Sequence, residues 1–272
     1  MNGYYSRIAA SALAAATLIF SLITLSPRAA AAYDDTRPYN WYVVRTKDHT
    51  QPAADPNMTF IEKNGGYYVD KKHADLGENT ERVLYLTFDA GYENGNIARI
   101  LDTLKEKNVT GAFFILGNMT ERFPELVMRM RDEGHLVCNH TYTHNDMSSV
   151  GDEAEFAAEL SRMADAYREL TGDEMPKYYR PPQGRFCERN LKFAENLGYK
   201  TIFWSFAYAD WDNNKQPSRD EAMKKVLDNT HNGAVILLHP TSKTNADIIG
   251  DLIDKWRADG YRFGTLDELC AD

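Results

Sequence analysis

The run Leu86-Thr87-Phe88-Asp89-Ala90-Gly91-Tyr92 ends a strongly apolar stretch that begins at Val83. A carboxylate in this position is typical of an acidic side chain at the rim of a buried β-strand. Further along, His140-Thr141-Tyr142-Thr143-His144 contains two imidazoles four residues apart, which can bind one metal ion. A carboxylate base beside a metal-bound water is the minimum set of groups for metal-assisted hydrolysis.

Three more polar groups follow at the ends of apolar or aromatic stretches. Arg180-Pro181-Pro182-Gln183-Gly184 is a stiff turn that carries a guanidinium, and Asp210-Trp211 ends an aromatic run. Leu237-Leu238-His239-Pro240 puts an imidazole at the end of another apolar stretch. Each motif alone is compatible with an ordinary turn or a buried polar group. Five such groups in one chain are hard to explain by core packing alone.

This set of motifs, in this order, resembles the polysaccharide deacetylases of the NodB-homology type, carbohydrate esterase family 4. Their motifs are TFDDG, H[ST]xxH, RxPxG, a D-W pair and LxxH, and the resemblance covers residues 81–270. A narrower similarity at 89–95 and at Asn40-Trp41-Tyr42 is to the muramic acid deacetylases. Those enzymes take part in making the delta-lactam of spore-cortex peptidoglycan.

The alternation of apolar runs and helical patterns after Glu81 predicts parallel strands with right-handed helical crossovers. Apolar side chains recur at three- and four-residue steps around residues 97–104, 156–167 and 248–256, which indicates helices. We expect seven strands, at 83–88, 111–116, 135–139, 177–180, 200–206, 234–238 and 262–265. The pattern fits an α/β fold, a distorted (β/α)7 barrel, which the resemblance also implies. In such barrels the catalytic groups lie at the C-terminal strand ends.

Two segments precede this domain, which we assign to residues 81–272. Residues 1–32 have the pattern of a secretory signal, with Arg7, an apolar core at 8–25 and small residues at 29–32. An uncleaved membrane anchor at 8–25 is the alternative, since its length is near the lower limit for a span. We therefore expect an exported protein, secreted or held at the cell envelope. Residues 33–80 are expected to form an irregular arm with short strands packed on the barrel.

Charge restricts the class of partner. The leader carries Arg7 and Arg28 and no acidic residue, so the remaining chain has 29 basic and 40 acidic residues and a formal charge of −11. This balance argues against nucleic acid or an anionic membrane surface as a partner. No obligate protein partner is indicated. A sugar polymer stays compatible with the charge.

The three cysteines are too few for a disulfide scaffold. Cys138 and Cys187 each lie close to a motif, so a disulfide between them is one possibility. Buried free thiols are the alternative that we favour. Cys270 is expected to be inert.

The resemblance implies one divalent metal ion, zinc or another exchangeable cation, bound by His140 and His144. The family's second Asp, normally the third protein ligand, is Ala90 here, and a methyl group cannot ligate. Metal binding should therefore be weak and exchangeable unless Asp89 or Asn94 moves in. The loss resembles a trait of the muramic acid subgroup. An inactive site is the alternative reading.

The same resemblance assigns the proton transfers in the hydrolysis of an N-acetyl group. Asp89 is expected to take the proton of the attacking water, with Arg180 holding it ionised and oriented. His239 is expected to protonate the departing amine, because an imidazole titrates near neutrality. Asp210 should support the protonated form of His239.

Three residues are candidates for contact with the substrate. The backbone N–H of Gln183, at the fourth position of the RxPxG motif, is implied as a donor to the oxyanion. Trp211 is expected in the pocket wall beside the acetyl methyl. Arg185 is the nearest cation along the chain for a lactyl carboxylate, because Arg180 should be engaged with Asp89.

The sequence therefore predicts a metal-dependent N-deacetylase of peptidoglycan glycan strands, acting on muramic acid in peptide-stripped strands. The alternative within enzymes is a deacetylase of N-acetylglucosamine units in peptidoglycan or a chitin-like glycan. The alternative outside enzymes is a secreted glycan-binding protein with a vestigial site. Release of amine from defined glycans distinguishes the three.

Overall fold

The computed structural model describes residues 34–74, 77 and 80–271, so the expected leader and its cleavage site lie outside the described residues. The chain from Asp35 onward forms one compact unit. Its centre is an eight-stranded parallel sheet in the order β11-β5-β6-β7-β8-β10-β4, with β12 paired to β5. The strands are β4 (Gly66–Tyr67), β5 (Arg82–Ala90), β6 (Ala112–Ile115), β7 (Leu136–Asn139), β8 (Tyr178–Tyr179), β10 (Lys200–Ile202), β11 (Ala234–Leu238) and β12 (Tyr261–Phe263).

The sheet curls, and short contacts join its two ends. Val69, just after β4, forms a bridge with Ala234 of β11, and Phe206, beyond β10, forms another with Ile236. These bridges close the sheet into the expected distorted barrel. All seven expected strands are present within a few residues of their predicted bounds, and β4 is an addition from the arm.

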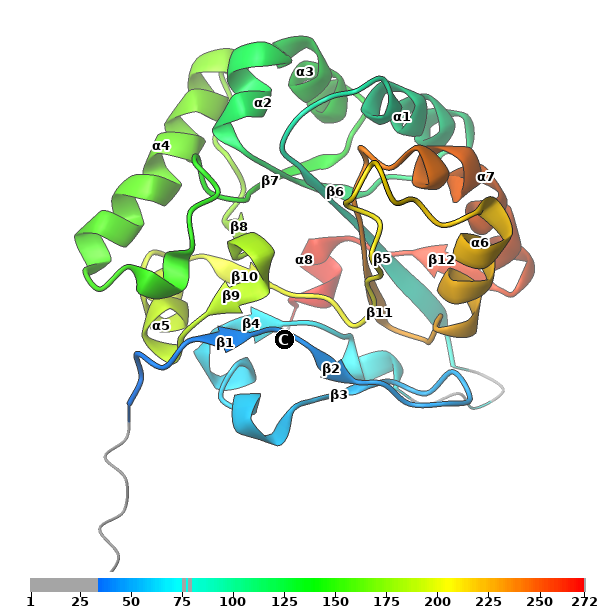
Figure 1. Cartoon of the computed structure of the whole chain (residues 1–272), viewed down its shortest axis with the longest axis horizontal. Helices are drawn as coiled ribbons and strands as arrows, with labels where there is room; N and C mark the ends of the chain where they lie inside the picture. The colour runs from blue at the N-terminus through cyan, green and yellow to red at the C-terminus, as the bar shows by residue number, and fades with distance from the viewer. Residues whose placement is uncertain (1–33, 75–76, 78–79, 272) are drawn as a thin grey trace, which may run out of the picture. The chain divides into compact units, whose positions relative to one another are not determined.

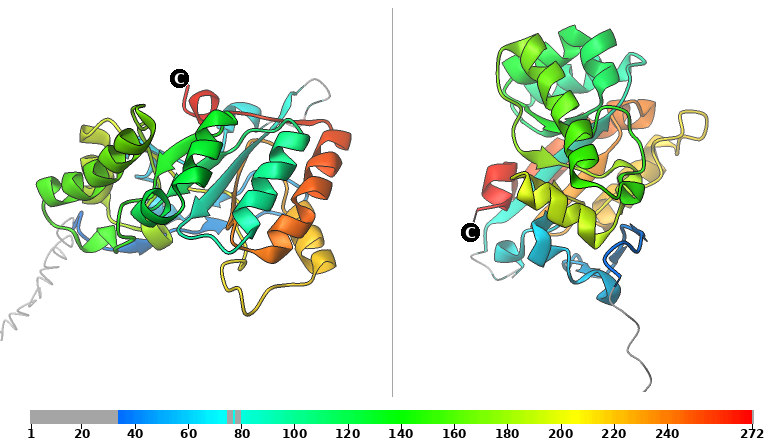
Figure 2. Two further views of the ribbon diagram at one scale, coloured as in Figure 1. Left: turned by 90° about the horizontal axis from the view of Figure 1, so that it is seen from above. Right: turned by 90° about the vertical axis from the view of Figure 1, so that its left-hand side faces the viewer.

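Helices α1 to α7 lie on the outside of this sheet (Figure 1). They are α1 (Asn96–Glu106), α2 (Gly117–Arg122), α3 (Pro124–Asp132), α4 (Glu153–Thr171), α5 (Glu188–Asn196), α6 (Arg219–Asp228) and α7 (Lys243–Ala258). The short α8 (Leu266–Leu269) instead packs its leucines into the cluster on the inner face of the sheet. Figure 2 shows α3, α1 and α7 side by side along the outer layer, with α4 next to α3. Pro124 begins α3, and Asp152 caps α4 by accepting from the N–H groups of Ala154 and Glu155.

Strand β5 shows why Asp89 reaches the interior. Successive side chains of a strand point to opposite faces. Leu84, Leu86 and Phe88 belong to the hydrophobic cluster between sheet and helices, whereas Val83 and Tyr85 belong to the inner cluster. Asp89 follows the inward series, and Ala90 joins the outer cluster, fully buried.

The N-terminal arm is more closely integrated than the sequence predicted. Its strand β1 (Tyr39–Asn40) pairs antiparallel with β9 (Arg185–Phe186), directly after the Arg180 turn. Strands β2 (Val43–Val44) and β3 (Ala53–Ala54) pair with each other. Three short 3-10 helices, η1 (Pro56–Met58), η2 (Glu62–Asn64) and η3 (Lys71–His73), complete the arm around β4. Because β4 is a strand of the main sheet, the arm and the barrel share one structure.

The described cysteines are free and buried. Burial raises the pKa of each thiol, to about 12 for Cys270. These thiols are therefore poor nucleophiles, as expected for packing residues. Within the described ranges, no helix has the length and apolar character needed to cross a bilayer.

Candidate active site

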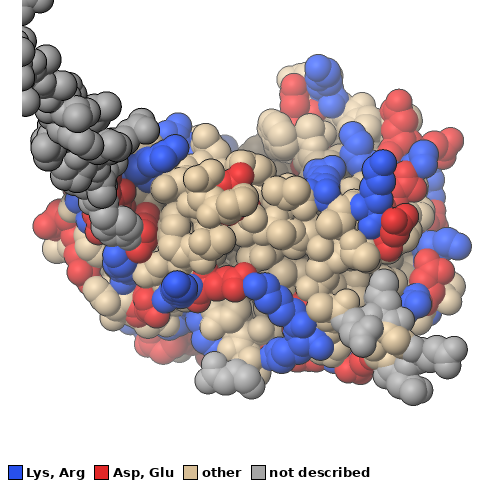
Figure 3. All heavy atoms as spheres, turned by 90° about the horizontal axis from the view of Figure 1, so that it is seen from below, with Lys and Arg blue, Asp and Glu red and all other residues tan. Residues whose placement is uncertain are grey.

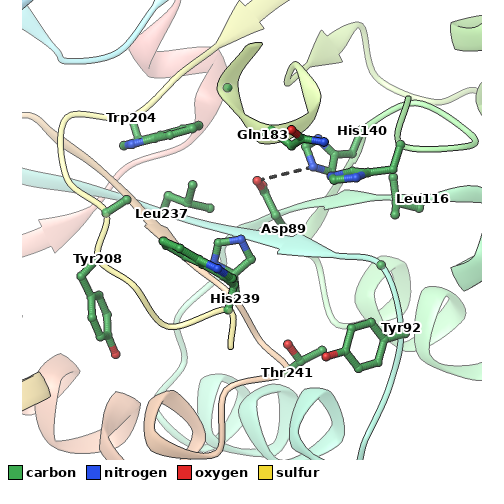
Figure 4. A pocket seen from close by; sticks show the side chains of 15 residues that line it. Asp89, Tyr92, Leu116, His140, Gln183, Trp204, Tyr208, Leu237, His239 and Thr241 are labelled. Carbon is green, nitrogen blue, oxygen red and sulfur yellow. Dashed lines mark ion pairs between the residues drawn. The ribbon is translucent and has the colours of Figure 1, made fainter. Parts of the chain in front are cut away.

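A pocket of about 570 Å³ lies at the C-terminal ends of the parallel strands (Figure 4). Asp89, His140, His144, Gln183 and His239 all line it, although they come from four separate segments of the chain. The rest of the wall is mainly aromatic and aliphatic: Tyr92, Leu116, Trp204, Ala207, Tyr208, Trp211, Leu237, with Gly91, Gly184 and Thr241. The position agrees with the rule that barrel enzymes place their chemistry at this end.

Asp89 is held by the fully buried Arg180. The Nη1 of Arg180 donates to Asp89 Oδ1 at 2.7 Å, and its Nη2 donates to Thr87 Oγ1 at 3.0 Å. Its Nε donates to the carbonyl of Ile202 at 2.9 Å, and the guanidinium stacks on Phe114 at 4.1 Å. Burial opposes ionisation of Asp89, but Arg180 in particular outweighs it and lowers the pKa of the carboxyl. Asp89 is therefore an oriented carboxylate at neutral pH.

His140 and His144 face each other beside this carboxylate. Their ring centroids are 5.1 Å apart, and His140 Nε2 lies 3.6 Å from Asp89 Oδ2, the contact dashed in Figure 4. The Nδ1 of His140 lies 2.8 Å from the carbonyl of Arg180, which can only accept. His140 must therefore carry its proton on Nδ1, which leaves the Nε2 lone pair toward Asp89. Burial lowers the pKa of His140 to about 4 and also lowers that of His144.

These two neutral imidazoles fit a divalent metal ion, because a ligating histidine must be unprotonated at the ligating nitrogen. Among the described residues no three His, Cys, Asp or Glu side chains gather as a ligand set. Asn94, the substitute ligand considered above, donates instead to the carbonyl of Thr241 at 2.8 Å. Ala90 points into the outer core. The protein therefore offers two imidazoles, with Asp89 as the nearest carboxylate.

His239 and Asp210 form a second pair on the other side of the pocket. Asp210 is fully buried, its Oδ1 lies 2.7 Å from His239 Nδ1, and its Oδ2 accepts the backbone N–H of His239 at 2.8 Å. Asn245 Nδ2 donates to the same Oδ2 at 2.6 Å. Burial favours the neutral imidazole, but the hydrogen bond and charge of Asp210 outweigh it and raise the pKa of His239.

Three residues near the pocket adopt left-handed backbone conformations although none is glycine. The φ angles are 72° for Thr141, 63° for His144 and 59° for Gln183. Such angles are uncommon for side-chain-bearing residues and concentrate where a site is held in a fixed shape. Thr141 is supported locally, since its N–H donates to Asn139 and its hydroxyl accepts the N–H of His144 at 3.0 Å.

Two of the three predicted substrate contacts line the pocket, and the third does not. Gln183 lines the pocket, as does Trp211, which is 61% exposed and whose ring centroid lies 6.1 Å from that of His239. Trp211 is therefore at the mouth of the pocket and not deep in its wall. Arg185 does not line the pocket, because its Nε lies 3.1 Å from Asp146 Oδ2. Its position gives no support to a direct contact with substrate.

Several supporting residues were assigned no role in the site by the motifs. Asn245 orients Asp210 from the first turn of α7. In the sequence, the one feature that could have indicated this role is a polar residue on the buried face of a helix. Tyr92 lines the pocket and meets Asn213 of the 207–217 loop through its hydroxyl. Trp41 of the arm holds the pocket wall from behind, which its place far upstream in the sequence does not indicate.

Comparisons with known proteins agree with this geometry. The family model described as "Polysaccharide deacetylase" matches residues 76–202. The chain is 38% identical to the peptidoglycan-N-acetylmuramic acid deacetylase PdaA of Bacillus subtilis, over 85% of this chain and 86% of that protein. It is 34% identical to a peptidoglycan-N-acetylglucosamine deacetylase of Bacillus cereus, over 87% and 84% of the two chains. The solved structure of Bacillus subtilis PdaA, a family 4 carbohydrate esterase, superimposes with a TM-score of 0.79 at 36% identity, covering 86% of this chain and 97% of that one.

Proposed function

Because the chain belongs to the polysaccharide deacetylase family, we propose that it hydrolyses N-acetyl groups of peptidoglycan glycan strands, at N-acetylmuramic acid. One observation carries the proposal. An ionised carboxylate, Asp89, and an imidazole with a raised pKa, His239, line one pocket beside a pair of neutral imidazoles. These groups match the proton acceptor, the proton donor and the metal ligands that amide hydrolysis requires.

The proton transfers follow from the two pairs. Asp89 takes a proton from the attacking water, and Arg180 keeps the carboxylate ionised and aimed into the pocket. His239 donates a proton to the amine nitrogen as the amide C–N bond breaks, so that acetate and a free amino sugar result. Asp210 holds Nδ1 of His239, which leaves Nε2 for the leaving nitrogen. The N–H of Gln183, in its left-handed turn, is our candidate donor to the oxyanion.

Deacetylases of this family generally depend on a metal ion. A divalent cation bound by His140 and His144 would polarise the acetyl carbonyl and lower the pKa of water. Zinc is our first choice because imidazole is among its preferred ligands, and with so few protein ligands the ion should exchange readily.

We expect metal binding and activity to be lost together when either imidazole is removed. In His140→Ala and His144→Ala, calorimetric titration with zinc should show no saturable site, and amine release should fall to background. Exhaustive chelation should silence the wild type, and added zinc should restore it. A matched control is His73→Ala, because His73 pairs with Asp70 in the arm, outside the pocket. Full activity after chelation would contradict the metal assignment.

A second expected result concerns pH. His239 faces Asp210 and, through space, Asp89, which raise its pKa, whereas burial and Arg180 lower it. The imidazole of His239 therefore stays protonated to a higher pH than usual. The favourable interaction of the imidazolium with Asp210 is lost as the pH rises through the raised pKa. In Asp210→Asn the basic limb of the kcat/KM profile should move to lower pH. NMR titration of the His239 ring should show the same displacement, and an unmoved limb would exclude His239 as the acid.

The choice of sugar needs one substrate panel. We expect faster amine release from peptide-stripped peptidoglycan, in which muramic acid carries a free lactyl carboxylate, than from intact peptidoglycan or chitin oligomers. The freed amine could then attack the lactyl carboxyl, whose C–O bond breaks with loss of water, to close the delta-lactam. Preference for chitin oligomers would favour the N-acetylglucosamine alternative, which the Bacillus cereus relative also represents. Glycan binding without amine release would favour the vestigial-site alternative.

We also propose that the protein works outside the cytoplasm, because its proposed polymer is there and because residues 1–32 have a secretory pattern. Fractionation of cells that express the full chain tests this. Mass spectrometry of the extracellular protein should find an N-terminus near Tyr33, whereas an uncleaved chain in the membrane fraction would support an anchor.

A further inference from the structure

The segment Trp41–Arg45 of the arm runs along the pocket wall and contacts it at both ends. The N–H of Trp41 donates to the carbonyl of Gly184 at 2.8 Å, and its indole Nε1 donates to the carbonyl of Trp204 at 2.8 Å. At the other end, Arg45 Nη2 donates to the carbonyl of Ala207 at 2.8 Å. Gly184, Trp204 and Ala207 all line the pocket. The segment therefore lies directly against three residues of the pocket wall.

The outer side of this segment is apolar and exposed. Tyr42 is 52% exposed and Val44 50% exposed, and among the described residues only Tyr92 and Trp211 at the pocket are comparable large exposed apolar side chains. The hydroxyl of Tyr42 is tied to Asp55, and β2 pairs with β3, so the ring is held in place. Figure 3, which views the arm's side of the molecule, shows a broad, mostly uncharged area at its centre, with a small acidic spot inside it. A rigid exposed aromatic ring suits stacking against a sugar ring better than it suits solvent.

Arg45 adds a cation at the end of this surface. Its guanidinium lies 5.6 Å from the ring of Phe206, and within the described part of the chain it has no carboxylate at ion-pair distance. The pocket lining contains no Lys or Arg. The buried Arg180 is occupied by Asp89, and Arg185 by Asp146. Arg45 is thus a cation in direct contact with the pocket wall that can still receive an anion.

On the basis of the proposed function, we propose that Tyr42 and Arg45 form a distal part of the glycan-binding surface. Tyr42 stacks on a sugar unit beyond the one in the pocket, and Arg45 pairs with a lactyl carboxylate of the strand. A peptide-stripped strand carries one such carboxylate on each muramic acid, so a cation beside the pocket selects this polymer over an uncharged one. The segment then favours long, charged strands.

The test compares peptide-stripped glycan oligomers of two lengths, a disaccharide and a hexasaccharide, each with free and with methylamidated lactyl groups. We expect wild-type kcat/KM to favour the free-carboxylate hexasaccharide. Arg45→Gln and Tyr42→Ala should each reduce the hexasaccharide-to-disaccharide ratio about two- to fivefold through KM, the scale of an exposed ion pair. On the methylamidated oligomers, which have no carboxylate for Arg45, the ratio should be the same in Arg45→Gln as in the wild type. In Tyr42→Ala the ratio should still be lower than in the wild type, because stacking does not need the carboxylate.

Arg45→Lys, which keeps the charge, should retain most of the preference. Arg37→Gln is the matched control, because Arg37 lies over the ring of Tyr39 in the same arm without a contact to the pocket lining. Equal ratios in Arg45→Gln, Tyr42→Ala and wild type would overturn the inference while amine release continues to support the proposed function. Calorimetric binding of the hexasaccharide to the same variants decides the inference even if no amine is released. Folding of each variant is checked by its thermal melting.

Discussion

Asp89→Asn should reduce turnover of peptide-stripped peptidoglycan by about 10²–10⁴-fold, the usual cost of losing a general base. Asparagine keeps the shape of the side chain but has no carboxylate to accept a proton. The amide oxygen can still accept from Arg180, which donates at 2.7 Å in the wild type, so the fold should persist. The measurement is single-turnover amine release at saturating substrate, with zinc present.

A matched control is Asp102→Asn. Asp102 also pairs with an arginine, Arg129 at 2.8 Å, but it is exposed on α1 outside the pocket. Its replacement should leave turnover close to the wild-type value. Zinc titration of Asp89→Asn should still find a saturable site, because both imidazoles remain. Turnover by Asp89→Asn comparable with the wild type would remove Asp89 from the role of base.

The positions of the strand-end residues could be predicted because two local patterns agree there. Apolar runs such as 83–88 and 234–238 mark buried parallel strands, and polar residues that follow them must meet at one end of the sheet. Asp89, His140, Gln183 and His239 accordingly line one pocket. The family resemblance added which groups belong together, and the similarity to known deacetylases confirms that family.

The arm could not be predicted in the same way. Strand β4 has two residues, Gly66 and Tyr67, too short for a periodic pattern to mark it. Its place beside β10 depends on pairing with a strand far along the chain, Thr201 with Gly66 and Ile202 with Tyr67. The contacts of Trp41 with Gly184 and Trp204 are equally non-local. Sequence spacing carries no signal for such contacts.

Arg185 shows the limit of arguing from proximity along the chain. Gln183 has a φ of 59° and Gly184 a φ of 65°, so the backbone reverses between the pocket and β9. Two residues beyond Gln183, the chain has left the pocket and Arg185 meets Asp146. Arg45 is far away in sequence, yet it contacts the wall at Ala207. A cation for the substrate is therefore better sought from wall contacts than from the motif.

Arg180→Met should be the most destabilising single change at the site, by about 3–5 kcal/mol, because it leaves a buried charge without its partner. Arg180 is fully buried and the side chain of Asp89 is only 9% exposed. The same change releases the carbonyls of Ile202 and Phe203 and the hydroxyl of Thr87 from their donor. Activity should fall with stability, because Asp89 loses the charge that keeps its pKa low.

The double variant Arg180→Met/Asp89→Asn separates the buried charge from the lost packing. Once position 89 is neutral, removal of the guanidinium no longer leaves a buried carboxylate without its partner. The double variant should therefore be less destabilised than the sum of the two single changes. Urea unfolding with a chelator present measures the free energies without a contribution from bound metal. We expect a coupling of about 1–3 kcal/mol between the two positions, whereas additivity within about 0.5 kcal/mol would mean that Arg180 acts as packing alone. In either case the double variant stays inactive. The change Asp89→Asn relieves the unpaired buried charge, but it also removes the general base.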